Sequence, residues 1–164
     1  MLQNLGIIAG NGDLPKEIAK LYSYAGGKCF IAAIDPEISF EEFSCEHFAL
    51  GSIGGIIEYF KKNVVENVIV VGGITRPDLK SLKVDFAGSA LLVKILKQKI
   101  LGDDNVLKIV SNYIESRGLK VISPKEILKL GEYNLDISSK STPSSQDKAD
   151  MEIGMQVIKS LGAL

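Results

Sequence analysis

The segment from Leu5 to Pro15 constrains the fold more than any other part of the chain, because an apolar run breaks there into a glycine turn and a helix start. An apolar run of this kind is typical of a buried parallel strand. Gly10 and Gly12 allow a tight turn and a close approach to a ligand. Pro15 suits the first helical position, where free N–H groups face anions. The pattern predicts a phosphate cradle, although an ordinary strand-to-helix turn without a ligand has the same appearance.

Predicted strands and helices alternate along the rest of the chain. Apolar runs predict strands over 5–9, 29–34, 47–50, 67–71 and 119–122, and helical spacing predicts helices over 14–25, 56–62, 87–101 and 105–117. Ser123 and Pro124 predict the cap and start of a further short helix. This order is typical of an α/β, Rossmann-like fold, in which a mostly parallel sheet carries helices on both faces.

A second glycine break, Gly72-Gly73, ends the predicted strand 67–71. Ligands of open parallel sheets bind beyond the carboxyl ends of the strands, so both glycine breaks are predicted to lie at the binding edge. Thr75 and Arg76 follow in the same connection, and an arginine there can bind a phosphate or carboxylate through two hydrogen bonds. A surface ion pair of Arg76 with Asp78 or Asp85 is the alternative.

The last thirty residues differ in composition from the rest. We expect a Rossmann-like domain over 1–135, a linker or ordered loop over 136–148, and a helix over 149–164 that leads to a further domain. An apolar surface near that last helix would favour dimers.

Composition excludes several classes of function. The net charge of −1 gives no basic patch for nucleic acid. No stretch approaches the roughly 18 apolar residues of a membrane span, and no signal peptide is evident, so we expect a cytoplasmic chain. Cys29 and Cys45 are expected to be reduced and structural. His47 is the only histidine, which argues against a Ser-His-Asp triad or a histidine-rich zinc site.

Four motifs occur in an order that resembles the LpxI-type UDP-2,3-diacylglucosamine pyrophosphatases of lipid A biosynthesis. They are Leu5-Gly-Ile-Ile-Ala-Gly-Asn-Gly-Asp-Leu-Pro15, Gly72-Gly-Ile-Thr-Arg-Pro77, Leu101-Gly-Asp-Asp-Asn-Val-Leu107 and Leu161-Gly-Ala-Leu164. The resemblance implies metal-dependent hydrolysis of UDP-diacylglucosamine to UMP and diacylglucosamine 1-phosphate, called lipid X. It covers only the family's N-terminal domain, and the Glu-Gly-Thr-Asp motif that carries the family's catalytic aspartate is absent from these 164 residues. We therefore expect a substrate-binding half that is inactive without a C-terminal domain.

The resemblance implies that the ligand of the candidate residues is a nucleotide-sugar pyrophosphate. Those interpreted as substrate-binding are Gly10, Asn11, Gly12, Asp13, Gly72, Gly73, Thr75 and Arg76. The family's metal is expected to be Mg²⁺, and Asp103 and Asp104 are candidate ligands because Mg²⁺ binds through one or two carboxylates and keeps its waters. Alternatively, one of the two aspartates caps a helix that begins at Asn105. Leu101 stands where the family usually has a basic residue, which weakens a phosphate-binding role for this turn.

Two other interpretations stay open. A nicotinamide-cofactor domain is suggested by Gly10, Gly12 and a downstream Asp35, although Pro15 replaces the third glycine of that pattern. The second open interpretation is a nucleotide-binding module without catalytic activity. The helix over 87–101 mixes apolar residues with lysines at 94, 97 and 99, which indicates either a core helix or an acyl-chain and membrane-surface contact at the inner membrane.

Overall fold

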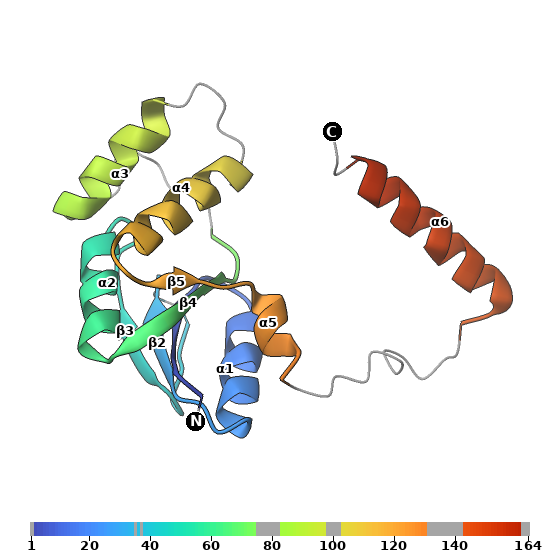
Figure 1. Cartoon of the computed structure of the whole chain (residues 1–164), viewed down its shortest axis with the longest axis horizontal. Coiled ribbons are helices and arrows are strands. Elements are labelled where there is room, and N and C mark those ends of the chain that lie inside the picture. The colour runs from blue at the N-terminus through green and yellow to red at the C-terminus, as the bar shows by residue number, and fades with distance from the viewer. Residues whose placement is uncertain are drawn as a thin grey trace. The chain divides into compact units, whose positions relative to one another are not determined.

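The computed structural model confirms an α/β architecture built on one sheet of parallel strands (Figure 1). It describes residues 2–34, 36, 38–74, 83–97, 103–130 and 143–161, and of residues 96, 97, 103–105 and 159–161 only the backbone. The chain divides into two compact units, Met1–Glu132 and Tyr133–Leu164. The first unit contains the sheet and five helices of the described chain.

The sheet has five strands in the order β3-β2-β1-β4-β5. The central strand β1 (Asn4–Ala9) pairs with β2 (Cys29–Ala33) on one side and with β4 (Val65–Val71) on the other. The edge strands are β3 (Ser44–His47) and β5 (Lys120–Val121). Every pairing is parallel, so all five carboxyl ends lie at one edge of the sheet.

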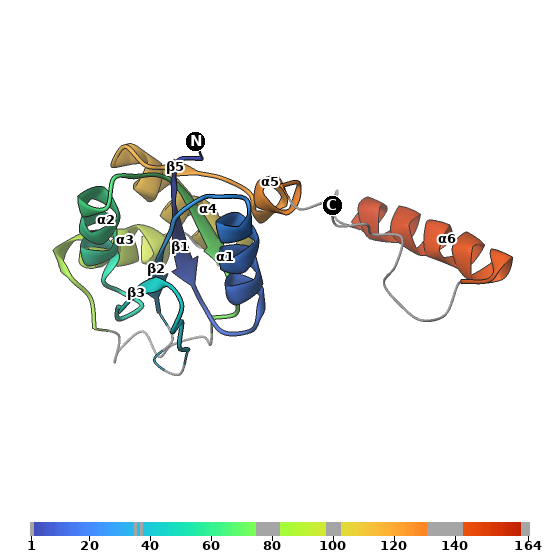
Figure 2. The ribbon, with the colours of Figure 1, turned by 90° about the horizontal axis from the view of Figure 1, so that it is seen from below.

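Helices cover both faces of this sheet, as Figures 1 and 2 show. The helices α1 (Leu14–Tyr24) and α5 (Pro124–Leu128) pack together on one face. The helices α2 (Ile53–Lys62) and α4 (Asp103–Ser116) cover the other, and α3 (Phe86–Lys97) packs against both of them. Each face thus has its own apolar cluster, as expected for a parallel sheet buried on both sides.

Alternation along β1 divides its side chains between the two clusters. Leu5 and Ile7 belong to the α1 side, whereas Ile8 belongs to the α2 side. Gly6 also faces α2, where the fully buried ring of Phe60 occupies the space that a side chain would need. A Cβ at Gly6 would lie 3.1 Å from that ring, so the glycine lets a large aromatic residue pack directly on the strand.

Element boundaries correct several expectations. The predicted strand over 47–50 is wrong, since β3 spans Ser44–His47 and pairs with Phe30–Ala33. That edge strand is mostly exposed and polar, so its sequence lacks the apolar alternation that marks a strand. The helix α2 begins at Ile53, three residues earlier than predicted, because tertiary packing overrides the low helix propensity of two glycines in its first turn.

Side-chain caps determine where two further helices begin, namely α5 and a helix of the second unit. The α5 prediction is confirmed, because Ser123 accepts from the N–H of Lys125 and forms a capping box with Glu126. In the second unit, α6 spans Ser145–Leu161, four residues longer at its start than expected. The reason is a cap at Ser144, whose Oγ accepts from the N–H of Asp147 at 3.1 Å.

No helix in the described ranges is both long and apolar enough to cross a bilayer.

We predict that Phe60→Ala lowers the free energy of unfolding by about 3–5 kcal/mol, because it leaves a cavity above Gly6 that the sheet cannot fill. Urea denaturation measures the change. Phe86→Ala is the matched control, since that ring is 94% exposed and its loss leaves no cavity. Equal effects of the two substitutions would contradict the proposed packing on β1.

Candidate functional site

The two glycine turns predicted from the sequence meet at the carboxyl edge of the sheet. β1 and β4 are neighbours, and Ala9 pairs with Val71 at their ends. Beyond that pair, the N–H of Asn11 donates to the carbonyl of Gly73 at 2.7 Å, and the N–H of Gly73 donates back to Asn11 at 2.7 Å. The two turns therefore form one hydrogen-bonded unit.

Close packing of backbone against backbone explains two of the glycines. A Cβ at Gly10 would overlap the carbonyl oxygen of Gly73. At Gly72, where φ is +99°, a Cβ would lie 2.6 Å from the carbonyl carbon of Gly10. Gly10 and Gly72 are thus required by the contact between the turns, independently of any ligand.

Gly12 differs from these two because it faces open space. Its φ is +103°, and a Cβ there would meet no atom within 4 Å. Asn11 and Asp13 on either side are exposed. Asp13 occupies the N-cap position of α1, yet its side chain makes no capping hydrogen bond. The first turn of α1 therefore carries backbone N–H groups that no side chain caps, at the end of the helix where the dipole is positive.

Asp85, which the sequence analysis considered only as an ion-pair partner, joins the starts of α2 and α3. Its Oδ1 accepts from the N–H of Gly88 at 2.6 Å, and its Oδ2 accepts from the N–H of Gly55 at 3.1 Å. The N–H of Asp85 donates to the carbonyl of Gly51 at 3.3 Å. An aspartate directly before a helix is an N-cap signal, so the sequence could have predicted the hydrogen bond with Gly88. The hydrogen bond with Gly55 depends on the tertiary fold, because Gly55 is 30 residues away in the sequence.

Several predicted residues lie outside the described part of the chain. Asp35, Thr75 and Arg76 are among them. The backbone of Asp103 and Asp104 is described and forms the first turn of α4. The expected cap before a helix beginning at Asn105 is wrong, because the helix begins two residues earlier.

No group of three His, Cys, Asp or Glu residues that could hold a metal occurs among the described side chains, which do not include those of Asp103 and Asp104.

The histidine and the cysteines make contacts consistent with structural roles. His47 ends β3, and its Nε2 lies 2.9 Å from the carbonyl oxygen of Ile38. Cys29 is buried, and burial raises the pKa of its thiol to about 12. Burial also raises the pKa of the Cys45 thiol, which is less enclosed. A raised pKa keeps both thiols protonated, so neither is a strong nucleophile at neutral pH.

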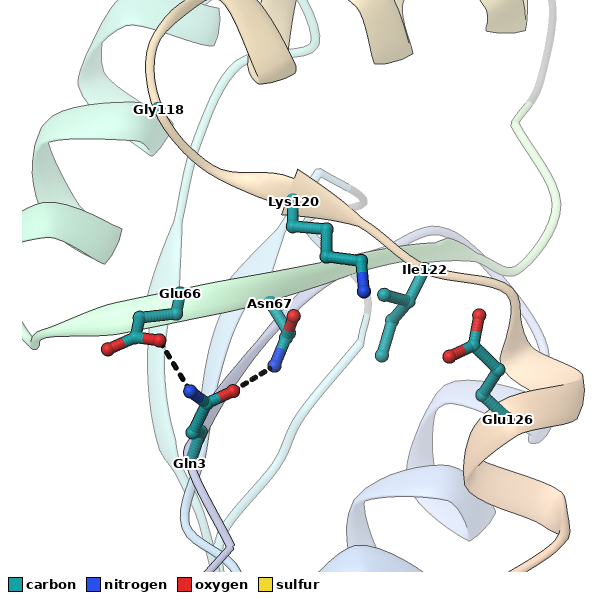
Figure 3. A pocket seen from close by; sticks show the side chains of 7 residues that line it. All are labelled: Gln3, Glu66, Asn67, Gly118, Lys120, Ile122 and Glu126. Atoms are coloured by element: carbon teal, nitrogen blue, oxygen red, sulfur yellow. Dashed lines mark hydrogen bonds between the residues drawn. The ribbon is translucent and has the colours of Figure 1, made fainter.

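A polar hollow of about 530 Å³ lies at the opposite, amino edge of the sheet (Figure 3). Gln3 stands in it between Glu66 and Asn67, donating to Glu66 at 2.5 Å and accepting from Asn67 at 2.6 Å. The rest of the hollow is lined by Gly118, Lys120, Ile122 and Glu126. We do not assign the candidate site to this hollow. The helix N-termini and glycine turns that can bind anions lie at the carboxyl edge of the sheet instead.

Comparison with known proteins assigns the family. Residues 4–130 match the model of the LpxI N-terminal domain. The chain belongs to the LpxI N-terminal domain family.

A relative supports this assignment over a longer stretch. The UDP-2,3-diacylglucosamine pyrophosphatase LpxI of Caulobacter vibrioides is 27% identical over 170 residues. The alignment covers 99% of this chain and 59% of the relative, so the chain spans about three fifths of the length of that curated relative. The matched LpxI domain includes both glycine turns, Asp85 and the first turn of α4.

We predict that Gly10→Ala destabilises this LpxI N-terminal fold by about 1–3 kcal/mol, because the new methyl group collides with Gly73. Gly12→Ala should cost about 1–2 kcal/mol through backbone strain alone, and it should leave the Asn11–Gly73 bridge intact. Thermal unfolding and amide exchange at Gly73 measure the two effects. Gly154→Ala, in open space on α6, is the control and should not destabilise. Fast exchange at Gly73 in Gly12→Ala would contradict this division of roles.

Thiol reactivity gives a second prediction. In native protein at pH 8, a disulfide reagent should modify Cys45 before Cys29, and unfolding should make both equally reactive. Because folding raises the pKa of Cys29 from 9.0 to about 12, the unfolded chain loses this proton first. The contribution of Cys29 to stability should therefore fall as pH rises from 9.0 toward 12. Rapid modification of Cys29 in native Cys45→Ser would refute the assignment.

Proposed function

We propose that this chain supplies the substrate-binding surface of a UDP-2,3-diacylglucosamine pyrophosphatase, which yields UMP and diacylglucosamine 1-phosphate. The observation that carries the proposal is the uncapped first turn of α1 beside the open backbone at Gly12. Backbone N–H groups at a helix N-terminus bind phosphate without a cationic side chain. Family membership and the named activity of the Caulobacter relative identify the class of phosphate ligand.

Each candidate residue has a distinct part in this proposal. The N–H groups that follow Gly12 bind the pyrophosphate, and the exposed amide of Asn11 and carboxylate of Asp13 bind hydroxyls of the ribose or sugar. Gly10, Gly72 and Gly73 hold this turn in place through their mutual contacts. Arg76 adds a bidentate phosphate contact, and Thr75 adds a hydroxyl contact from the same loop.

Mg²⁺ is the proposed metal, with the carboxylates of Asp103 and Asp104 as its protein ligands. Such an ion neutralises phosphate charge and keeps bound waters, which suits pyrophosphate hydrolysis. The two aspartates occupy the first turn of α4, where the helix dipole stabilises ionised carboxylates. Because this helix runs back to the amino end of β5, its first turn lies toward the carboxyl edge that carries the glycine turns.

Nuclear magnetic resonance tests the binding site directly. Addition of UMP to labelled protein should shift the amide resonances of Gly12, Asp13 and Leu14, and Asn11→Ala should weaken UMP binding by about two- to tenfold through the loss of one hydrogen bond. Lys120→Ala, at the amino-edge hollow, is the matched control and should bind UMP like the parent. Shifts confined to Lys120 and Glu126 would overturn the proposed site. Equal or stronger shifts with NAD would favour the nicotinamide alternative.

Hydrolysis tests the division of the active site. With Mg²⁺ and UDP-2,3-diacylglucosamine, this chain alone should be inactive, because the Glu-Gly-Thr-Asp motif of the family is absent from its sequence. Addition in trans of a domain that carries this motif should restore hydrolysis, and a chelator should abolish it. Hydrolysis by the chain alone would show that Asp13, Asp103 or Asp104 suffices. No hydrolysis with either preparation would leave a nucleotide-binding module.

A further inference from the structure

The outward face of α3 carries apolar side chains that no described element covers. Phe86 is 94% exposed and Val93 is 50% exposed, with the exposed Ala90 between them. Positions i, i+4 and i+7 lie in one row along a helix, so these three residues form a single stripe. On the inner side, Ala87, Leu91 and Ile95 pack into the cluster of α2 and α4.

Charge along α3 has one sign only. Lys94 is exposed beside the stripe. The sequence from Phe86 to Leu101 contains three lysines and no acidic residue, in a chain whose net charge is −1. The nearest acidic side chain in the sequence is Asp85, whose carboxylate accepts from the N–H groups of Gly55 and Gly88. An apolar stripe on a helix whose charged side chains are all lysines is the composition of a helix that lies in the interface of an anionic bilayer. The centre of a protein–protein interface is instead depleted in lysine, which makes a protein partner the less suitable occupant.

We propose that this α3 stripe, Phe86, Ala90 and Val93 with Lys94, binds the surface of an anionic lipid bilayer. Phe86 and Val93 enter the boundary between headgroups and acyl chains, and Lys94 lies among the lipid phosphates. The stripe begins one residue after Asp85, whose hydrogen bonds with Gly51 and Gly55 hold the start of α3 against the start of α2.

Membrane binding through α3 would bring the start of this helix, which Asp85 ties to the start of α2, close to the lipid surface. Figure 1 shows α3 beside α2 and α4, on the outside of the sheet domain. The inference goes beyond the proposed pyrophosphatase role and does not depend on it, because an anionic bilayer without any UDP-sugar is a sufficient ligand.

Cosedimentation with vesicles tests the inference. We use the full chain with vesicles of phosphatidylglycerol and phosphatidylethanolamine, and with phosphatidylcholine vesicles for comparison. The parent should bind the anionic vesicles, and binding should weaken as salt is raised. Phe86→Ser should weaken binding about tenfold because it removes a buried aromatic ring from the lipid interface. Lys94→Glu should also weaken it about tenfold or more, because it reverses a charge at the membrane surface.

Matched controls separate this stripe from general effects. Tyr24→Ser removes an aromatic side chain that is 88% exposed at the end of α1, and Lys148→Glu reverses an exposed charge on α6. Both should bind anionic vesicles like the parent. Circular dichroism confirms that each variant is folded.

Three results would overturn the inference. They are a parent that does not bind anionic vesicles, stripe variants that bind like the controls, and a Phe86→Ser variant that dissociates a dimer while vesicle binding is unchanged. The last result would assign the stripe to a protein interface. Because the vesicles contain no nucleotide, none of these outcomes depends on whether the chain binds UMP.

Discussion

The pairing of β1 with β4 is the constraint on which the candidate site depends. Ala9 and Val71, which pair at the ends of these strands, are 62 positions apart in the sequence, and the carboxyl ends carry the glycine turns to the same point. Once the two strands are adjacent, the backbone N–H and C=O groups of Asn11 and Gly73 form two hydrogen bonds with each other. That exchange fixes the direction in which the chain leaves both strands. It also leaves Gly12 and the first turn of α1 facing solvent.

The same edge is held at a second point by Asp85. A single carboxylate accepts N–H groups from the first turns of α2 and α3, so one side chain caps two helices. The connection that leaves β4 is therefore tied at its start by Gly73 and at its end by Asp85. Thr75 and Arg76 belong to that connection in the sequence, and both of its ends are fixed to the sheet edge. Proteins often place binding residues on loops whose ends are anchored to a rigid scaffold in this manner.

The sequence predicted the positions of strands and helices better than it predicted the structural roles of individual residues. The strands β1, β2 and β4 were predictable because they are buried on both faces and read as short apolar runs. The edge strand β3 was misplaced because its residues are mostly exposed and polar. The start of α4 was placed two residues late because Asp103 and Asp104 were interpreted as a turn. Gly10 and Gly72 were interpreted as ligand-facing, whereas their closest contact is with the neighbouring turn.

The sequence by itself determined the fold class, the strand-then-helix order and the family, because burial periodicity, turn residues and motif order are local properties that the linear chain displays. Only the tertiary structure decided which glycine faces open space, because that depends on which strand lies beside β1. It also decided that Asp85 serves two helices and that Phe86 is exposed whereas Phe60 is buried. Phe60 lies within a predicted helix and Phe86 directly before another, and the packing of α2 and α3 around the sheet determines which of the two rings loses its contact with water.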